Sequence, residues 1–303
     1  MWRFRIYAAA FALLLAAPIG VSGAPHTNPM QTSATAIMNR LAKEKDPYWR
    51  SAKEIAYKSV PELIAQHNDE LARSARHRKL MHGPMAVKHI ALTFDDGPHP
   101  KYTPRILEIL RRYNVKATFF VVGFMAEKYP TLVKAELGGG HSVGNHTYHH
   151  VNLSKIPEAY VATEIKACGE VLASIGGRAP HLFRPPGGDY NESVAQVIDT
   201  LGYELILWTD DPGDYASPGE DVIVQRTLDA ISPGGIILIH DGVQQTVDVL
   251  PTLIKELKAR GYEFVTIDEM IKEKALYGKD AGLRRRMSIA PGYGGTHLGA
   301  PLR

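Results

Sequence analysis

Apolar runs and helix-forming stretches alternate along the central part of the chain. Runs such as IALTF at 90–94 and IILI at 236–239 are typical of strands that are buried on both faces. Between such runs lie longer amphipathic stretches, as in TPRILEILRRYN at 103–114, where Thr103 and Pro104 indicate a helix start. The pattern therefore predicts strands that alternate with helices.

The same alternation continues through residues 89–271. Further strands are predicted at 116–123, 181–186, 203–208 and at the start of 262–271, and further helices at 124–137, 156–177, 192–202, 219–231 and 247–261. Strands that alternate with helices of about ten or more residues imply right-handed βα units on a parallel sheet. The expected fold class is α/β, a (β/α) barrel with about seven parallel strands and thus smaller than the usual eightfold barrel.

The start of the chain differs from this body. Residues 1–23 are predicted to be a signal peptide for export to the periplasm or the outside, because Arg3 and Arg5 precede an apolar stretch and small residues follow at 21–24. The apolar stretch is short for a membrane span, and an uncleaved anchor is the alternative. An exported chain whose single cysteine is Cys168 has no internal disulfide, so its core must be stabilised without one.

Charge is distributed unevenly over the 303 residues. Residues 24–88, expected to form a mostly helical extension, carry 11 Lys/Arg against 6 Asp/Glu, and residues 272–303, expected to be a disordered Gly-rich tail, carry 7 against 2. The body at 89–271 carries 15 against 24. The basic arms are either simply solvated or in peripheral contact with an anionic envelope surface. Nucleic acid is not an expected partner, since the arms lack interleaved aromatic and basic residues, and the oligomeric state stays open.

Polar residues with catalytic chemistry follow the predicted strands. They are Asp95, Asp96, His146, His150, Arg184, Asp211, Asp214 and His240. In α/β barrels the carboxyl ends of the strands form the rim on which active sites are built. Any one of these residues alone could be a turn or a cap, but their shared position predicts a catalytic site.

A metal site is one interpretation of HTYHH at 146–150. If this stretch is a helical turn, His146 and His150 lie on one side and share an ion with a carboxylate, whereas the alternative is a surface loop with ordinary histidines. A cation would also explain the adjacent Asp95 and Asp96, because one carboxylate binds the metal and the other acts as a base on water. The alternative for DDGP is a tight turn.

Three further residues fit acid–base chemistry. Arg184 would keep the base carboxylate ionised and oriented, or it is a structural ion-pair partner. The glycines that follow it allow a backbone N–H to approach an oxyanion. His240, at the end of an apolar strand, is a candidate general acid oriented by Asp214, with a structural histidine as the alternative.

Together these motifs resemble the polysaccharide deacetylases of carbohydrate esterase family 4. TFDDGP, HTYHH, RPPGG, DPGDY and ILIH occur in that family's order across residues 89–270. The resemblance implies a distorted (β/α) barrel with seven strands. It implies the following roles: Asp95 as base, Asp96, His146 and His150 as metal ligands, Arg184 as tether of the base, His240 as acid, and Asp214 as the residue that tunes the acid.

The resemblance also implies the substrate contacts. Gly187 would donate its N–H to the oxyanion, and Ile237 and Leu238 would wall the acetyl methyl group. Three positions depart from the commonest family pattern, since Gly187 replaces a frequent aromatic residue, Tyr215 a frequent tryptophan and Ile237 a frequent leucine. We therefore expect a sugar subsite of altered shape.

The expected function is metal-dependent removal of acetyl groups from N-acetylated or O-acetylated sugars. The substrate would be an envelope or extracellular polysaccharide, such as peptidoglycan or a chitin-like glycan. Zn is the expected metal because it suits mixed N/O ligands, with Co, Ni or Mn as alternatives. Two other functions stay open, namely a small-molecule amide or cyclic-imide hydrolase and a non-catalytic glycan-binding protein.

Overall fold

The computed structural model describes residues 55–288, with side chains described as far as residue 277. The predicted signal peptide at 1–23 lies outside the described residues, as does the end of the tail at 289–303. Between residues 55 and 288, no helix combines the length and the apolar character that a membrane crossing requires.

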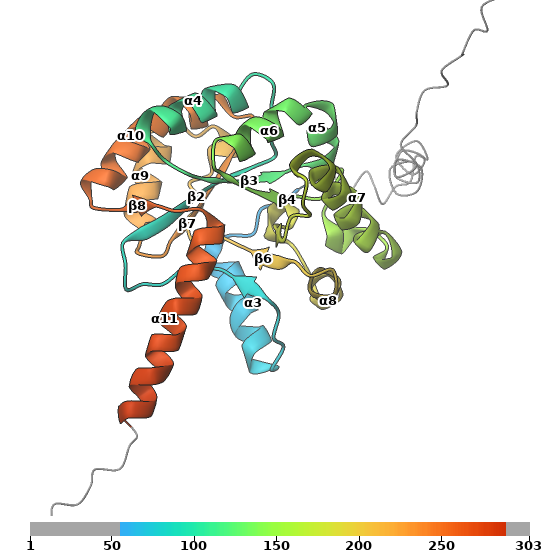
Figure 1. The fold of residues 1–303 in the computed structure, drawn as a ribbon, viewed down its shortest axis with the longest axis vertical. Coiled ribbons are helices and arrows are strands. Elements are labelled where there is room, and N and C mark those ends of the chain that lie inside the picture. Colours follow the sequence, from blue (N-terminus) through green and yellow to red (C-terminus); the bar gives the residue numbers. More distant parts are fainter. Residues whose placement is uncertain (1–54, 289–303) are drawn as a thin grey trace, which may run out of the picture.

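Parallel strands form the curled centre of the molecule (Figure 1). The strands are β1 (Lys79–Leu80), β2 (His89–Asp95), β3 (Thr118–Val121), β4 (Ser142–Asn145), β5 (Leu182–Phe183), β6 (Glu204–Ile206), β7 (Ile236–His240) and β8 (Glu263–Phe264). Their order is β1-β6-β5-β4-β3-β2-β7, with β8 paired to β2, and all of these pairs are parallel. After β6, Asp210 forms a parallel bridge to Ile237 of β7, which joins the two sides of the sheet. The predicted barrel with about seven parallel strands is confirmed.

Helices surround this barrel, and the last of them extends away from it (Figure 1). They are α3 (Val60–Ala72), α4 (Thr103–Tyr113), α5 (Gly123–Lys128), α6 (Pro130–Gly138), α7 (Glu158–Gly176), α8 (Glu192–Thr200), α9 (Glu220–Ala230), α10 (Gln244–Ala259) and α11 (Ile267–Ser288). Helix α4, for example, packs by an apolar face with Ile106 and Leu110, which are four residues apart and fully buried. The single helix predicted at 124–137 is two helices, because Pro130 cannot continue α5 and instead begins α6.

Large apolar side chains fill the interior. The aromatic rings of Phe94 and Phe119 stack with centroids 5.0 Å apart, and Phe120, Phe183 and Trp208 are fully buried as well. The lone cysteine is also buried, and its thiol donates to a backbone carbonyl. The core is therefore held by packing, as expected for a chain without an internal disulfide.

The strand β4 is absent from the elements predicted above. Its sequence, SVGN, contains no apolar run, so hydrophobic patterning gives no signal for it. Its Gly144 lies so close to a neighbouring ring that a Cβ there would be 2.7 Å from Phe120 Cδ1. The strand is formed because β3 and β5 pair with it on both sides, which is a tertiary effect.

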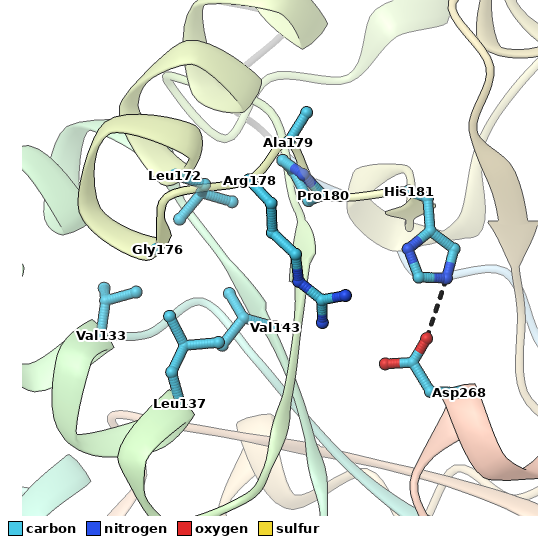
Figure 2. A pocket seen from close by; sticks show the side chains of 10 residues that line it. All are labelled: Val133, Leu137, Val143, Leu172, Gly176, Arg178, Ala179, Pro180, His181 and Asp268. Carbon is cyan, nitrogen blue, oxygen red and sulfur yellow. Dashed lines mark ion pairs between the residues drawn. The ribbon is translucent and has the colours of Figure 1, made fainter.

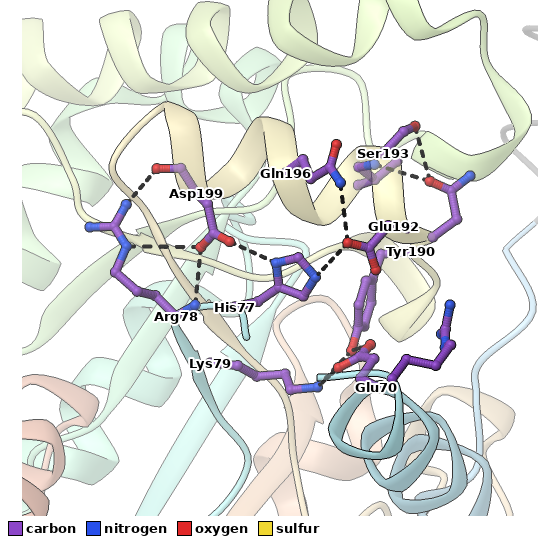
Figure 3. A network of polar contacts seen from close by, with 12 residues as sticks. Glu70, His77, Arg78, Lys79, Tyr190, Glu192, Ser193, Gln196 and Asp199 are labelled. Carbon is purple, nitrogen blue, oxygen red and sulfur yellow. Dashed lines mark hydrogen bonds and ion pairs between the residues drawn. The ribbon is translucent and has the colours of Figure 1, made fainter. Parts of the chain in front are cut away.

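Part of the predicted N-terminal extension belongs to the barrel. Strand β1 lies within that extension and pairs with β6. Polar contacts join the extension to the region around α8 (Figure 3). Glu70 on α3 accepts from Lys79 and from the Tyr190 hydroxyl, and His77 and Asp199 lie 2.7 Å apart. The described part of the extension is thus fastened to the body.

The tail also differs from expectation. Residues 272–288, expected to be disordered, continue α11 as a helix. The helix begins with Ile267 and Met270, which are fully buried, and good helix formers such as Lys272 and Ala275 follow. Tertiary packing of the first turns gives the helix a nucleus from which it extends into the basic segment.

Candidate active site

Parallel register brings the predicted site residues to one rim. Asp95, the last residue of β2, lies opposite His240, the last residue of β7. Asn145 ends β4 directly before His146, and Arg184 follows β5. Because the carboxyl ends of parallel strands meet at the same edge, the loops that follow them place these side chains together.

Asp96, His146 and His150 form a compact cluster. Asp96 Oδ1 lies 2.9 Å from His150 Nε2 and 3.4 Å from His146 Nε2. One potential ligand atom from each residue lies within 4.8 Å of the other two. Asp96 has a φ of 72°, a left-handed conformation that turns its carboxylate out of the line of β2, while the preceding Asp95 stays in the strand.

The histidine pair is held by a loop, so the helical turn considered for HTYHH is wrong. Thr147 and His150 have φ values of 63° and 54°, which are incompatible with an α-helix. The buried carboxylate of Glu164 on α7 shapes this loop, since it accepts the backbone N–H of Tyr148 at 3.0 Å and of His149 at 2.9 Å. The His149 ring also contacts Glu164, which turns it away from the cluster.

The cluster fits a divalent cation. His146 Nδ1 donates to the Arg184 carbonyl at 2.8 Å, so its Nε2 carries the lone pair that faces Asp96. The buried Asp96 Oδ1 and His150 Nε2 atoms face each other at 2.9 Å, and neither has a hydrogen bond of good geometry to any described residue. Burial alone would raise the pKa of Asp96, but the two imidazoles hold that pKa well below its usual range. One carboxylate and two imidazoles form a donor set that suits a catalytic metal with an open position.

Asp95 is held beside this cluster by a buried arginine. Arg184 Nη1 donates to Asp95 Oδ1 and to Thr93 Oγ1, both at 2.7 Å. The guanidinium is 0% exposed and lies 4.1 Å from the centre of the Phe120 ring. The other Asp95 oxygen, Oδ2, lies 3.6 Å from His146 Nε2 and therefore faces the candidate metal site.

His240, the register partner of Asp95 on the neighbouring strand β7, belongs to a second ion pair at the site. Its Nδ1 and its backbone N–H both donate to the Asp214 carboxylate at 2.7 Å, and Thr246 donates to the same carboxylate. Burial would lower the pKa of His240, but Asp214 and the more distant Asp96 raise it to about 9. His240 Nε2 is buried without a hydrogen-bond partner among the described residues. The imidazole can therefore offer a proton at Nε2 to a group bound in the site.

Comparisons with known proteins show the family to which the chain belongs. The family model described as polysaccharide deacetylase matches residues 82–206. A peptidoglycan-N-acetylglucosamine deacetylase of Bacillus cereus is 41% identical over 196 residues, which cover 63% of this chain and 92% of that protein. The chain belongs to the polysaccharide deacetylase family. The predicted family and the predicted enzyme class, a hydrolase, are confirmed.

Two further similarities extend across most of each partner's length. A chitooligosaccharide deacetylase of a Bradyrhizobium species is 36% identical over 199 residues, which cover 61% of this chain and 91% of that protein. The crystal structure of the Bc1960 peptidoglycan N-acetylglucosamine deacetylase, in complex with a naphthalenyl N-oxidanyl-benzamide, superposes with a TM-score of 0.64. It is 36% identical and covers 66% of this chain and 95% of that chain. The similarity supports the barrel described above as the deacetylase fold.

The two apolar residues expected to wall the acetyl group lie on different faces of β7. Ile237 and Leu238 are both 0% exposed. Successive side chains of a strand point to opposite faces, so Leu238 shares the face of His240 whereas Ile237 does not. Of the pair, Leu238 alone faces the same side of the sheet as the candidate acid.

Tyr57 is a site residue that the sequence analysis does not find. Its ring stacks on Tyr215, with centroids 4.2 Å apart, and its edge lies against His240, with centroids 5.2 Å apart. The residue comes from the extension, in which no motif or apolar pattern marks it. Glu164 was missed in the same way, because a helical acid looks like an ordinary solvated residue until α7 is packed against the loop.

A hollow elsewhere on the molecule belongs to a different region (Figure 2). It is lined by the apolar side chains of Val133, Leu137 and Leu172 and by an ion pair between His181 and Asp268, 2.8 Å long. His181 lies directly before β5, so the hollow is at the amino ends of the strands. The candidate active site is at their carboxyl ends, where polysaccharide deacetylase chemistry is expected.

Proposed function

We propose that the chain hydrolyses acetyl groups of N-acetylated sugars in an envelope polysaccharide, such as peptidoglycan or a chitin-like glycan. The observation that carries this proposal is that the Asp96, His146 and His150 cluster shares one rim with a tethered carboxylate, Asp95, and a paired imidazole, His240. The relatives named above, which are peptidoglycan and chitooligosaccharide deacetylases, support this substrate class.

The metal-facing half of the site would activate water. Asp96, His146 and His150 would hold a divalent cation, with Zn favoured by the mixed N/O donors. When bound, such a cation supplies Lewis acidity and lowers the pKa of nearby water. Asp95 would accept the proton from the attacking water, because Arg184 keeps this carboxylate oriented and the Asp95 Oδ2 atom faces the cluster.

His240 and the residues beside it would release the amine. Attack of water forms the new C–O bond of acetate, and the C–N bond breaks as His240 Nε2 donates a proton to the sugar nitrogen. An amine leaves poorly without a proton, so an imidazole whose pKa is about 9 suits an N-acetyl group better than an O-acetyl group. The backbone N–H of Gly187 would contact the oxyanion, and Leu238 would meet the acetyl methyl group.

The location of this activity is part of the proposal. Export would bring the enzyme to an envelope glycan, and the predicted signal peptide at 1–23 and the peptidoglycan relatives support it. The basic arms would then lie near an anionic envelope surface, where contact depends on salt concentration.

Acetate release from several glycans tests the function. The purified chain is incubated with chito-oligosaccharides, peptidoglycan and acetylated xylan, with and without a chelator, and Zn is then added back. We expect acetate from N-acetylated glycans, loss of release with the chelator and recovery with Zn. Absence of acetate from every glycan with Zn present would overturn the proposal, and release from xylan alone would overturn the N-acetyl assignment.

A further inference from the structure

The segment before α3 lies against the acid side of the site. Lys58 fastens it by two groups. Its backbone N–H donates to the Gly187 carbonyl at 2.9 Å, and its ammonium group lies 3.1 Å from Asp189 and donates to Gln66 at 2.6 Å. This segment precedes residues 82–206, which the family model matches, and it also precedes TFDDGP, the first of the family motifs.

Gly187 leaves room for this segment. A Cβ at residue 187 would lie 2.6 Å from the Ala56 carbonyl oxygen and 2.8 Å from Ile55 Cγ2. The φ of Gly187 is +66°, which also disfavours a side chain. The segment therefore occupies the space above Gly187 that a side chain of residue 187 would need.

Tyr57 points from this segment to the candidate acid. The Tyr57 and Tyr215 rings are nearly parallel, at 17°, and both meet the His240 ring edge-on, at 86° and 80°. Burial and the carboxylates of Asp96 and Asp95 raise the pKa of Tyr57, so its hydroxyl stays protonated. The two tyrosines form an aromatic pair at the imidazole, and Tyr215 is 42% exposed.

We propose that Tyr57 is a substrate-contacting residue whose ring, together with Tyr215, forms the wall of the sugar subsite beside His240; this inference rests on the proposed deacetylase function. The C–H faces of sugar rings are apolar and pack on aromatic rings, while the sugar hydroxyls remain hydrated or hydrogen-bonded. A sugar placed against the outer side of the pair brings its acetylated nitrogen toward His240.

Because the extension is anchored, Tyr57 is better suited to form a fixed part of the sugar subsite than to block the site reversibly. Tyr57 is adjacent to Lys58, and α3 follows three residues later. Helix α3 is itself held by the buried Lys79–Glu70 pair and by Tyr190 (Figure 3). A ring presented by a fastened segment loses little conformational entropy when a ligand binds, which favours a binding role.

Substitution of Tyr57 with separate readouts of KM and kcat tests the inference. With chito-oligosaccharide as substrate, Tyr57→Ala should raise KM by about tenfold and leave kcat within about twofold, because the ring binds sugar without taking part in bond breaking. Tyr57→Phe should keep the KM of the parent chain, because it retains the ring. Lys58→Met should raise KM less, since it removes the side-chain tether and leaves the backbone contact.

A matched control is Tyr277→Ala, which removes a half-exposed tyrosine from α11. That helix packs at the amino ends of the strands, where Glu273 contacts His89, so KM should not change. An unchanged KM in Tyr57→Ala would overturn the inference. A rise in kcat/KM would also overturn it, because it would show that the segment blocks the site.

Binding measured in the Asp95→Asn background separates this inference from the proposed function. Affinity for chito-oligosaccharide should fall about tenfold when Tyr57→Ala is added. If the parent chain binds the oligosaccharide but releases no acetate, the proposed function fails, and the loss of affinity still supports the Tyr57 wall. If acetate is released and affinity is insensitive to Tyr57, the wall fails alone. If the oligosaccharide neither binds nor is hydrolysed, both fail.

Discussion

The two sides of the candidate site are built by different means. On the metal-facing side, charged groups are fixed by buried partners, as Asp95 is by Arg184 and the histidine loop is by Glu164. On the side of the candidate acid, an ionic pair of His240 and Asp214 adjoins the rings of Tyr57 and Tyr215, of which Tyr215 is 42% exposed. The buried partners of the first side hold its charged groups in one arrangement, whereas the second side combines the candidate acid, His240, with aromatic rings that carry no charge.

This contrast has an energetic reason. An ionised group in a buried site costs several kcal/mol unless its partners are in place, so changes on the metal-facing side should be severe. Aromatic contacts at a partly exposed wall contribute about 0.5–1.5 kcal/mol each, so changes there should be graded.

The largest effect should follow removal of the shared ligand. Asp96→Ala leaves two imidazoles without their carboxylate, so bound Zn should be lost and acetate release should fall by on the order of 1,000-fold or more. Metal content by mass spectrometry and acetate release measure the two effects. Asp69→Ala on the exposed face of α3 is the control and should change neither. Retained Zn with full activity would contradict the metal assignment.

The next effect concerns the tether of the base. Arg184→Lys keeps the positive charge but replaces the planar guanidinium by a rounder ammonium group. The guanidinium contacts Thr93 and Asp95 and lies over the Phe120 ring, and an ammonium group does not reproduce this geometry. We expect kcat to fall by on the order of 100-fold while Zn content is retained. Circular dichroism establishes that the variant is folded. A lysine variant with unchanged kcat would show that Arg184 has no role in orienting the base.

On the acid side, loss of Asp214 should change the pH profile. The acid must be protonated, so activity is lost as pH rises through the pKa of His240, which Asp214 raises to about 9. In Asp214→Asn that pKa falls, and the alkaline limb of kcat should move to lower pH by at least one pH unit. The measurement is kcat from pH 6 to 10. An alkaline limb that does not move would remove His240 as the acid.

The smallest effect lies beside the site and concerns stability. Burial raises the pKa of Asp210 to about 8, with Asp211 adding to the shift. The folded state therefore keeps this proton between about pH 4 and 8 while the unfolded chain loses it, so stability falls as pH rises through this window. Asp210→Asn should reduce the loss of unfolding free energy between pH 5 and 8 by on the order of 1–3 kcal/mol.

Urea unfolding at the two pH values measures this difference. Asp241, whose pKa burial raises to about 7, contributes with the same sign, so part of the slope should remain in the variant. The exposed Asp69→Asn change serves as the control and should leave the slope as it is. An equal slope in Asp210→Asn would show that this carboxyl is ionised in the folded protein.

The sequence permitted accurate prediction of features that are local. Apolar runs indicated most strands, and catalytic residue types directly after them indicated one rim, because the carboxyl ends of parallel strands share an edge. The position of Ile237 could also have been predicted, since an odd spacing from His240 puts it on the other face of a strand. The expectation that Ile237 walls the acetyl group followed the resemblance and did not take this alternation into account.

Other features depend on partners distant in the chain. The histidine loop takes its shape from Glu164, and the strand β4 exists because two neighbours pair with it. Neither partner can be identified from spacing, since each contact forms only when α7 and the sheet are in place. The same holds for α11, whose first turns are held by burial of Met270 in the core.

The sequence by itself determined the barrel, the order of the motifs along the chain and the residue types that can hold a cation and move protons. The tertiary structure alone decided which side chains lie against these residues, above all Tyr57, whose ring contacts that of His240 from a segment that no local pattern marks. The physical reason is that strand and motif signals arise between near neighbours, whereas stacking of Tyr57 on Tyr215 requires the extension to be fastened across the folded rim.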